Sequence, residues 1–512
     1  MKIEVEGSLT IFSALSLLLI LSFLLALLEG ARVSGLQMMD TLAADTGMDC
    51  VAAEYQTVLW DKYHLLYLDG AYGWDQFDEN KVSSRVMDYV AGNLSETGEN
   101  SVFRTKLCEA SMLEYMFATD NDGTGMLRQA SAYMKRHLPE DVAKKMYQQY
   151  QDGKKAEADG KTEYSVEDAD QAIINAKKEK EQADQNDKEG APQEEAGEKN
   201  IQDNENNHAQ DAEDGKKESP IQIVLQLKQN ALLGMTVSDM SSLSAKAVEA
   251  KDMVSNRQCE TGRYDMKKAE KMNVSDRVMV LEYIGKHFSG YTEPGKGDLT
   301  YEMEYILCGK DTDKKNLESS IERLMRMREA ANVAHIIADR EKLNQTLMIA
   351  TSLAGFSGNP AVVKIVQIGV VAAWAYVESI LDLRTLLSGG KISLIKSAAE
   401  WTTDLKKLGE IVTGEGKARE CKNGLSYQAY IKQLLFAMKE KKMAYRMMDI
   451  MELAMQKEQN GKNARMDHMI DNMICELRFE AKPLFAKRSL YGDMEMGGYT
   501  FFKRQKLSYI NK

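Results

Sequence analysis

Proline and histidine are scarce in this 512-residue sequence, where each occurs only six times. Few prolines, combined with many methionine, leucine, alanine, lysine and glutamate residues, favour long helices. The histidines are far apart, and none lies at the short spacing typical of metal ligands. The sequence also lacks an HExxH motif, a nucleophile motif and a glycine-rich dinucleotide loop. We therefore expect a protein that is not an enzyme and binds no metal or cofactor.

The cysteines and the overall charge exclude two further classes of protein. No two cysteines form a CxxC pair, which argues against a structural zinc site. Disulfides stay open, because the sequence does not select among the pairings that six cysteines allow. The net charge of −12 makes the chain a poor ligand for nucleic-acid phosphates, so we expect no nucleic-acid partner. The cysteines are Cys50, Cys108, Cys259, Cys308, Cys421 and Cys475.

An uncharged apolar run covers residues 8–28 and follows a short leader, residues 1–7. At roughly 20 residues, the run is long enough to cross a bilayer as a helix. A cleaved secretory signal would have a shorter apolar core, a basic leader and small residues at the cleavage site. Here glutamates offset the lysine of the leader, and Glu29 follows the run. We therefore predict a retained transmembrane helix.

Small residues recur every four positions in this helix, at Ser22, Ala26 and Gly30. Such a stripe lets two helices approach closely inside a membrane. Small residues are also common in membrane helices that have no such contact, and the sequence does not decide between the two interpretations.

The helical spacing of apolar residues continues beyond the run to about Leu68, with Gly35 and Gly47 as places for a kink. Residues 29–150 are expected to form this helical extension together with a strand and a helix of a soluble domain. The strand is predicted within residues 103–120, where apolar residues partly alternate, and the helix over Met126–His137.

The remaining chain divides into three segments by composition. Residues 151–218 contain almost no large apolar side chains, so we predict a disordered charged insertion that is dispensable for folding. Residues 219–460 are expected to form a helical subdomain with one strand, around Leu299–Tyr305. Residues 461–512 are expected to hold the end of a helix and a pair of strands. The predicted fold class is therefore α+β and helix-dominated, with a small antiparallel sheet.

A second apolar segment, Ala361–Leu387, follows a favourable helix start at Asn359-Pro360. Lys364, Gln367 and Glu378 would be costly to place inside a bilayer. We therefore predict a buried central helix of the soluble part.

Arg328 lies in the helix predicted before this segment, on the same apolar face as His335. A buried guanidinium needs a partner, and Glu378 and Asp382, one turn apart, are the candidates. Because no nucleophile or base lies nearby in the sequence, we interpret this as a structural ion pair rather than a catalytic arginine. The single His335 is interpreted as a core residue rather than a ligand.

Two motifs resemble binding loops but lack essential positions. The stretch from Asp120 has carboxylates at the first and third positions of a calcium loop, but Ser131 stands where a bidentate glutamate is needed. Ser388–Lys391 and Gly414–Lys417 lack the spacing and the Ser or Thr of a phosphate-binding loop. We interpret the first as a turn before a helix and Ser388–Gly390 as a helix end.

The N-terminal stretch "GSLTIFSALSLLLILSFLLALLEGAR" resembles the N-terminal segment of TadE/TadG-type pseudopilins. Several later stretches resemble a family of unknown function in Gram-positive bacteria that is often associated with Tad pilus genes, domain-of-unknown-function family 5702. These stretches are "SPIQIVLQLKQNALLG", "VSNRQ", "EYILCGK", "RMREAANVAHIIAD" and "WAYVESILDLRTLLSGGKISLIK". In prepilin-type processing a glutamate follows the glycine by five residues, whereas Phe12 follows Gly7, so cleavage after Gly7 stays open.

The resemblance implies a single-pass membrane protein with a cytoplasmic N-terminus and an extracytoplasmic bulk. Its expected function is that of a non-enzymatic, pseudopilin-like component of a Tad-type pilus or secretion assembly. The expected partners are the membrane and other pilus or pseudopilin subunits, which the N-terminal helix would contact. The alternative is a cell-surface binding or sensor protein that shares only the anchor.

Overall fold

A computed structural model describes residues 3–95, 102–160, 165–189, 219–264, 272–409, 416–458, 461–484 and 497–509. The fold is helix-dominated α+β with a small antiparallel sheet, which confirms the predicted class. The chain forms two compact units, each built from separate segments. Unit 1 comprises Met1–His137, Glu249–Tyr283 and Lys439–Lys512, and unit 2 comprises Leu138–Val248 and Ile284–Met438.

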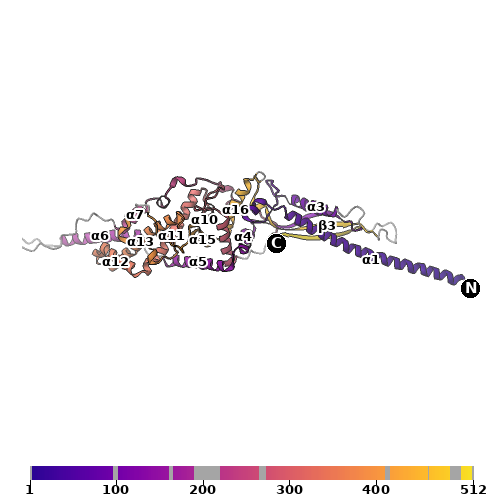
Figure 1. Ribbon diagram of the computed structural model, residues 1–512, viewed down its shortest axis with the longest axis horizontal. Coiled ribbons are helices and arrows are strands. Elements are labelled where there is room, and N and C mark those ends of the chain that lie inside the picture. Colours follow the sequence, from indigo (N-terminus) through magenta and orange to yellow (C-terminus); the bar gives the residue numbers. More distant parts are fainter. Residues whose placement is uncertain are drawn as a thin grey trace, which may run out of the picture. The chain divides into compact units, whose positions relative to one another are not determined.

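Unit 1 is built on α1 (Ile3–Ala52), a continuous helix of 50 residues that extends well beyond the sheet (Figure 1). Side chains from Leu9 to Leu28 are almost all exposed, whereas from Glu29 onward every third or fourth residue is buried. The predicted extension of this helix to Leu68 is wrong. The chain leaves the helix after Ala52 because Gln56 N donates to Tyr67 O at 2.7 Å, which begins an extended pairing.

The four strands form one antiparallel sheet with β3 at its centre. β2 pairs with β3 along one edge, and β4 and β1 pair with it along the other. The strand predicted within residues 103–120 is β2, and the predicted C-terminal pair is β3 and β4. The strands are β1 (Leu68–Asp69), β2 (Lys106–Phe117), β3 (Met469–Ala481) and β4 (Tyr499–Ser508).

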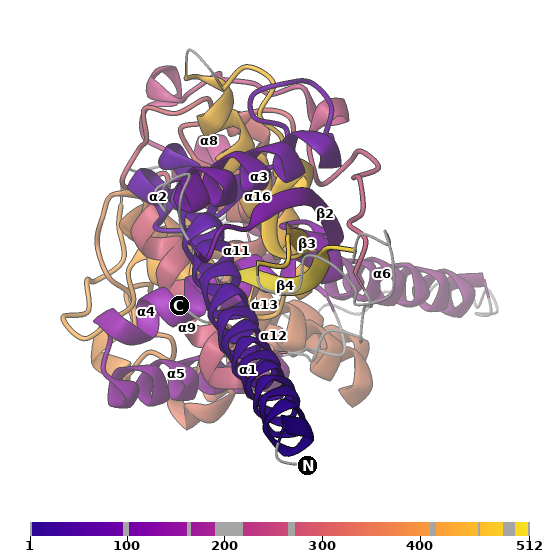
Figure 2. The same cartoon turned by 90° about the vertical axis from the view of Figure 1, so that its right-hand side faces the viewer.

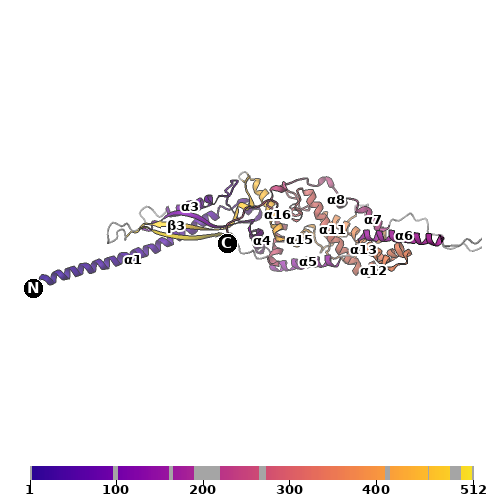
Figure 3. The same cartoon turned by 180° about the vertical axis from the view of Figure 1, so that it is seen from behind.

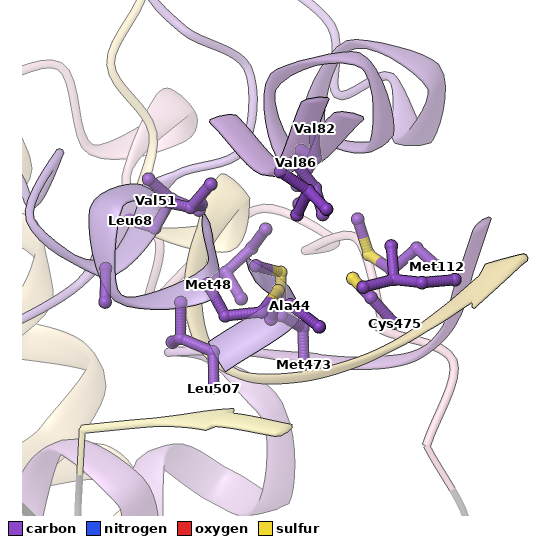
Figure 4. Packing of buried hydrophobic residues seen from close by; sticks show 14 of the residues in the cluster. Ala44, Met48, Val51, Leu68, Val82, Val86, Met112, Met473, Cys475 and Leu507 are labelled. Atoms are coloured by element: carbon purple, nitrogen blue, oxygen red, sulfur yellow. The ribbon is translucent and has the colours of Figure 1, made fainter. Parts of the chain in front are cut away.

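The C-terminal half of α1 and helix α3 (Glu79–Ser95) supply the apolar residues that pack on the sheet. Viewed along α1, the strands lie beside this half of the helix (Figure 2). Alternate residues of β3, such as Met473 and Cys475, point into this core. The core therefore joins α1, α3 and all four strands, as the labelled residues show (Figure 4).

Gly35 and Gly47 do not kink α1. A Cβ atom at Gly47 would overlap with the side chain of Val90 in α3, and one at Gly35 would overlap with the ring of Phe103. Both positions therefore need glycine because another element packs directly against the helix backbone.

Shorter elements complete unit 1. They are α2 (Thr57–Tyr63), η1 (Asp120–Gly123), α4 (Thr124–His137), η3 (Ala250–Asp252), α16 (Glu440–Gln456) and η7 (Met466–His468). α4 confirms the helix predicted to end at His137. The long α9 (Val274–His287) begins in unit 1 and ends in unit 2.

Unit 2 is helical, and α13 (Pro360–Leu387) is its most buried helix. Asn359 caps α13 by accepting a hydrogen bond from Ala361 N, and Pro360 occupies the first turn. The predicted buried central helix is thereby confirmed. Its neighbours include α11 (Asp313–Ala338), α12 (Arg340–Ala354) and α6 (Val166–Glu189), which extends past the other helices (Figure 3).

The other elements of unit 2 are short, apart from α5. They are α5 (Glu140–Asp159), α7 (Pro220–Leu227), α8 (Leu232–Thr236), η2 (Met240–Ser242), α10 (Glu302–Cys308), η4 (Gly355–Ser357), η5 (Ala398–Glu400), η6 (Leu405–Lys407) and α15 (Tyr427–Phe436). α7, α15 and, in unit 1, α16 lie within residues 219–460, which were expected to be mainly helical.

The strand predicted around Leu299–Tyr305 is wrong, because the chain forms α10 there. All residues from Met303 to Cys308 are buried, and all but Glu304 are apolar, so this helix is buried on every face. Alternation of apolar residues over so short a segment does not distinguish a buried helix from a strand. Gly309, with φ of 64°, ends the helix.

The predicted disordered insertion is also wrong over much of its length. Residues up to Asp159 belong to α5, and residues from Val166 to Glu189 form α6. Small residues allow α6 to pack on α13: a Cβ atom at Gly369 would overlap with that of Ala169. Residues 161–164 and 190–218 lie outside the described residues. Removing α6 would expose this face of α13, so the contact argues against the expectation that the whole segment is dispensable for folding.

The contact at Gly47 predicts a selective loss of stability in unit 1. Gly47→Ala should lower the free energy of unfolding by about 1–3 kcal/mol, because Val90 or the helix must move. Gly92→Ala in α3 is the matched control, since nothing lies within 4 Å of its added methyl group. The control should be neutral or stabilising by up to about 1 kcal/mol. Thermal unfolding followed by circular dichroism measures both, and equal midpoints would contradict the packing argument.

Candidate functional site

Arg328 of α11 is fully buried in unit 2, beside α13. Its Nε donates to Asp382 Oδ2 at 3.0 Å, and its Nη2 lies 3.0 Å from the same oxygen. Its Nη1 donates to the carbonyl oxygens of Ser393 and Leu394 and to the Tyr430 hydroxyl, at 2.9–3.0 Å. The guanidinium therefore holds together α11, α13, α15 and the loop after α13.

Polar neighbours complete the environment of Asp382. Asn332, one turn after Arg328, donates to Asp382 Oδ2 at 3.0 Å and to Ser379 Oγ at 2.9 Å. The buried Tyr430 hydroxyl donates to Ile392 O at 3.3 Å, and burial raises the pKa of Tyr430 to about 12. The tyrosine therefore stays protonated and serves as a neutral hydrogen-bonding partner.

Glu378 lies one turn before Asp382 but binds a different cation, Lys396. Lys396 Nζ donates to Glu378 Oε1 and lies 2.5 Å from Asp382 Oδ1. The backbone N–H groups of Thr402 and Thr403 donate to the two oxygens of Glu378, at 3.1 and 2.9 Å. Lys396 thus bridges the two carboxylates, and we call Arg328, Glu378, Asp382 and Lys396 the buried charge cluster.

The sequence did not point to Lys396. It follows α13 in a segment without helical or strand periodicity, so no pattern assigned it to a buried face. A lysine placed between apolar residues, in "SLIKSAAEW", was the available signal, but such a lysine usually keeps its ammonium group in water.

Aromatic residues pack beside the cluster. The ring of Trp401 lies near Lys396 and stacks on His335, with 4.9 Å between the ring centres. Trp374 packs edge-on against Trp401 and donates to Thr403 Oγ1 at 2.8 Å. Burial and the nearby Lys342 lower the pKa of His335. His335 is therefore a neutral, partly buried stacking residue, as expected for a core histidine.

The buried charge cluster is suited to holding helices together. Its two cations balance its two carboxylates, and all four side chains are removed from solvent. Among the described residues, no group of three or more His, Cys, Asp and Glu side chains could hold a metal ion. The geometry therefore agrees with a structural ion pair, enlarged to four members.

The membrane-helix positions lie elsewhere, in unit 1. Ser22, Ala26 and Gly30 are exposed on α1, and no atom lies within 4 Å of a Cβ built at Gly30. The Ser22 hydroxyl donates to Leu19 O within α1 at 2.8 Å, and the role of the three residues in packing against another helix stays a prediction. Gly7 lies within α1, which begins at Ile3.

The resemblance to binding loops has a structural explanation. Asp120 Oδ2 accepts hydrogen bonds from Phe117 N at 2.7 Å and Gly262 N at 3.0 Å, so it fixes a turn before α4. Ser388 and Gly389 end α13, and Gly389 has a φ of 89°. Gly414–Lys417 lies partly outside the described residues. All six cysteines lie within them, and none forms a disulfide.

Residues 210–481, just over half of the chain, match the sequence model of a family described as a family of unknown function, DUF5702. The chain belongs to this family. The matched region includes the buried charge cluster and β3 but not α1. Comparisons with curated proteins and with solved structures found no match. Because the family is one of unknown function, membership in it assigns no activity to the chain.

The buried charge cluster predicts a large cost for removing one partner. Arg328→Met should lower the free energy of unfolding by about 3–5 kcal/mol, because Asp382 would lose its hydrogen-bonded cation in a buried site. Arg326→Met, at an exposed position of α11, should change it by less than about 0.5 kcal/mol. Denaturant unfolding of both variants tests this, and similar values would show that the cluster is energetically unimportant.

A buried carboxyl in unit 1 predicts that stability depends on pH. Burial raises the pKa of Asp471 to about 7, although Gln129 donates to it at 3.0 Å. Because the pKa is higher in the folded than in the unfolded state, the folded state binds more protons between about pH 4 and 7. Stability should therefore increase as the pH falls through this window, by at most about 1.4 kcal/mol per pH unit from this group. Asp40, whose pKa burial raises to about 6, acts in the same direction.

Asp471→Asn separates this effect from that of other groups. The amide keeps the size of the carboxyl but does not titrate, so unfolding midpoints measured between pH 5 and 8 should vary less than in the unsubstituted chain. An unchanged pH dependence would mean that Asp471 is not the titrating group.

Proposed function

We propose that this DUF5702 protein is a non-enzymatic, single-pass membrane component of a Tad-like pilus or secretion assembly, with a pseudopilin-like N-terminal helix. The observation that carries the proposal is the division of α1 into two halves. The first half exposes apolar side chains over the length of a bilayer, and the second half is buried against an antiparallel sheet. Helix plus sheet is the arrangement that the pseudopilin resemblance implies.

Two described helices, α1 and α13, are long and apolar enough to cross a membrane. The most apolar part of α13 is 56% buried within its unit, whereas that of α1 is not buried at all. The apolar part of α1 is therefore suited to a membrane anchor or a signal sequence. The glutamates of the leader and Glu29 favour the retained anchor. The pseudopilin resemblance, rather than the flanking charges, is the ground for proposing a cytoplasmic N-terminus and an extracytoplasmic bulk.

The extramembrane half of α1 offers a surface for another helix. Met38 is 73% exposed and Leu42 is 57% exposed, on the face opposite to the buried residues Leu36 and Ala43. Exposed large apolar residues on a helix that continues a membrane span favour lateral contact with a similar helix. This surface supports assembly with other subunits through α1.

Photo-crosslinking in the native host tests the proposal. A photoreactive residue at Met38 or Leu42 should form adducts with pilus or pseudopilin subunits, or with a second copy of the chain. The same residue at Trp74, 64% exposed in unit 1 but outside α1, serves as the control and should give none. If the protein is membrane-bound and neither α1 position gives an adduct, the alternative of a surface binding or sensor protein is favoured instead.

A further inference from the structure

The ends of three strands of unit 1 meet beside the place where the apolar part of α1 ends. Lys106 at the start of β2 pairs with Glu480, and Ala481 at the end of β3 pairs with Tyr499 at the start of β4. This end of the sheet, which we call the sheet tip, consists here of residues 102–106, 480–484 and 497–500.

Direct contacts fix the sheet tip to the first turn of α1 after the apolar run. Glu29 and Arg32 form a buried ion pair at 2.8 Å. Arg32 Nε donates to Val102 O at 2.6 Å, and Leu484 N donates to the Glu29 carboxylate at 3.3 Å. Side chains of a helix tilt toward its N-terminus. Along the axis of α1, these partners therefore lie at the height of residues 29 and 32 or slightly nearer to the apolar run.

The position of these contacts can be compared with the dimensions of a bilayer. If α1 spans the hydrocarbon core up to Leu28, the headgroup layer covers about the next 5–8 Å. At 1.5 Å per residue, this layer reaches to about residue 33 of α1. The contacts at Glu29 and Arg32 therefore place Val102 and Leu484 at the depth of the headgroup layer.

The side chains at the sheet tip have the chemistry of such a layer. Val102 is 49% exposed, Phe103 is 41% exposed and Leu484 is 37% exposed. Lys106 and Lys482 are also exposed there, together with the single carboxylate of Glu480, in a chain whose net charge is −12. Apolar groups together with lysines are typical of segments that lie at the boundary of acyl chains and anionic headgroups.

We infer that the sheet tip rests on the bilayer in which α1 is anchored, with Val102 and Leu484 at the boundary of its acyl chains. This inference rests on the proposed membrane anchor. It goes beyond that proposal because it gives unit 1 a second contact with the lipid. Two contacts, one through α1 and one through the sheet tip, fix the height and the tilt of unit 1 at the membrane surface.

Tryptophan quenching by lipids tests the inference. The full chain is reconstituted into vesicles of phosphatidylcholine and phosphatidylglycerol whose acyl chains carry bromine near the headgroup. Val102→Trp and Leu484→Trp place a new fluorophore at the sheet tip. Met38→Trp is the control, because Met38 is also exposed but lies ten residues beyond Leu28, about 15 Å above the hydrocarbon core. Leu18→Trp reports on the span itself.

The expected result is loss of the added emission for Leu18→Trp and for both tip variants, with no loss for Met38→Trp. All values are compared with the unsubstituted chain in the same vesicles. Quenching of Leu18→Trp together with tip variants that behave like Met38→Trp would overturn the tip contact and leave the anchor intact. Absence of quenching for Leu18→Trp would overturn the anchor and the tip contact with it.

Discussion

One helix of this protein has to satisfy two different environments. The first half of α1 exposes apolar side chains on all sides, and the second half buries one face against a sheet and exposes the other. Because α1 is continuous, the orientation of the sheet is fixed relative to the apolar half. Gly35 and Gly47 let neighbouring side chains reach the helix backbone, which makes this fixation close and specific. Without this helix, the apolar residues of α3 and of the sheet would lose the residues of α1 that pack against them.

Unit 2 depends on a different kind of interaction. Burying four charged side chains is costly, and the cost is offset only when every donor and acceptor has a partner. Arg328 and Lys396 lower this cost by binding two carboxylates on the same helix, α13, and Arg328 also donates to the Ser393 and Leu394 carbonyls and to the Tyr430 hydroxyl. Such a cluster tolerates few alternative arrangements, so it specifies how α11, α13 and α15 pack as well as stabilising them.

The region that matches the family and the apolar part of α1 are separate parts of the chain. DUF5702 covers the buried charge cluster, whereas the residues that suggest a role in an assembly lie on α1. Under the proposed function, the exposed Met38 and Leu42 would contact another helix, and the ion pair of Glu29 and Arg32 ties the sheet tip to the end of the apolar run. Under the same proposal, unit 1 holds the protein at a membrane through α1. Unit 2 is attached to the membrane only through its connection to unit 1 in the same chain.

The sequence by itself determined the features that depend on neighbouring residues. An uncharged run of sufficient length gave the apolar part of α1, and Asn359 with Pro360 gave the start of α13, because capping and periodicity act over one or two turns. The burial of Arg328 on an apolar helix face was also predicted, and its partner was narrowed to Glu378 or Asp382, since a buried guanidinium needs a carboxylate; the structure selects Asp382. The partial alternation of apolar residues in β2 was sufficient to predict a strand.

Only the tertiary structure decided features that depend on residues far apart in the chain. Lys396 became the partner of Glu378 because the loop after α13 folds back over it, which no local pattern encodes. Leu299–Tyr305 became part of a loop and α10 rather than a strand because its surroundings bury every face of that helix. The polar α6 became ordered because a few small residues, among them Ala169, fit against Gly369 of α13. In each case the structure depends on a contact that forms only on folding, and such a contact cannot be predicted from composition or periodicity.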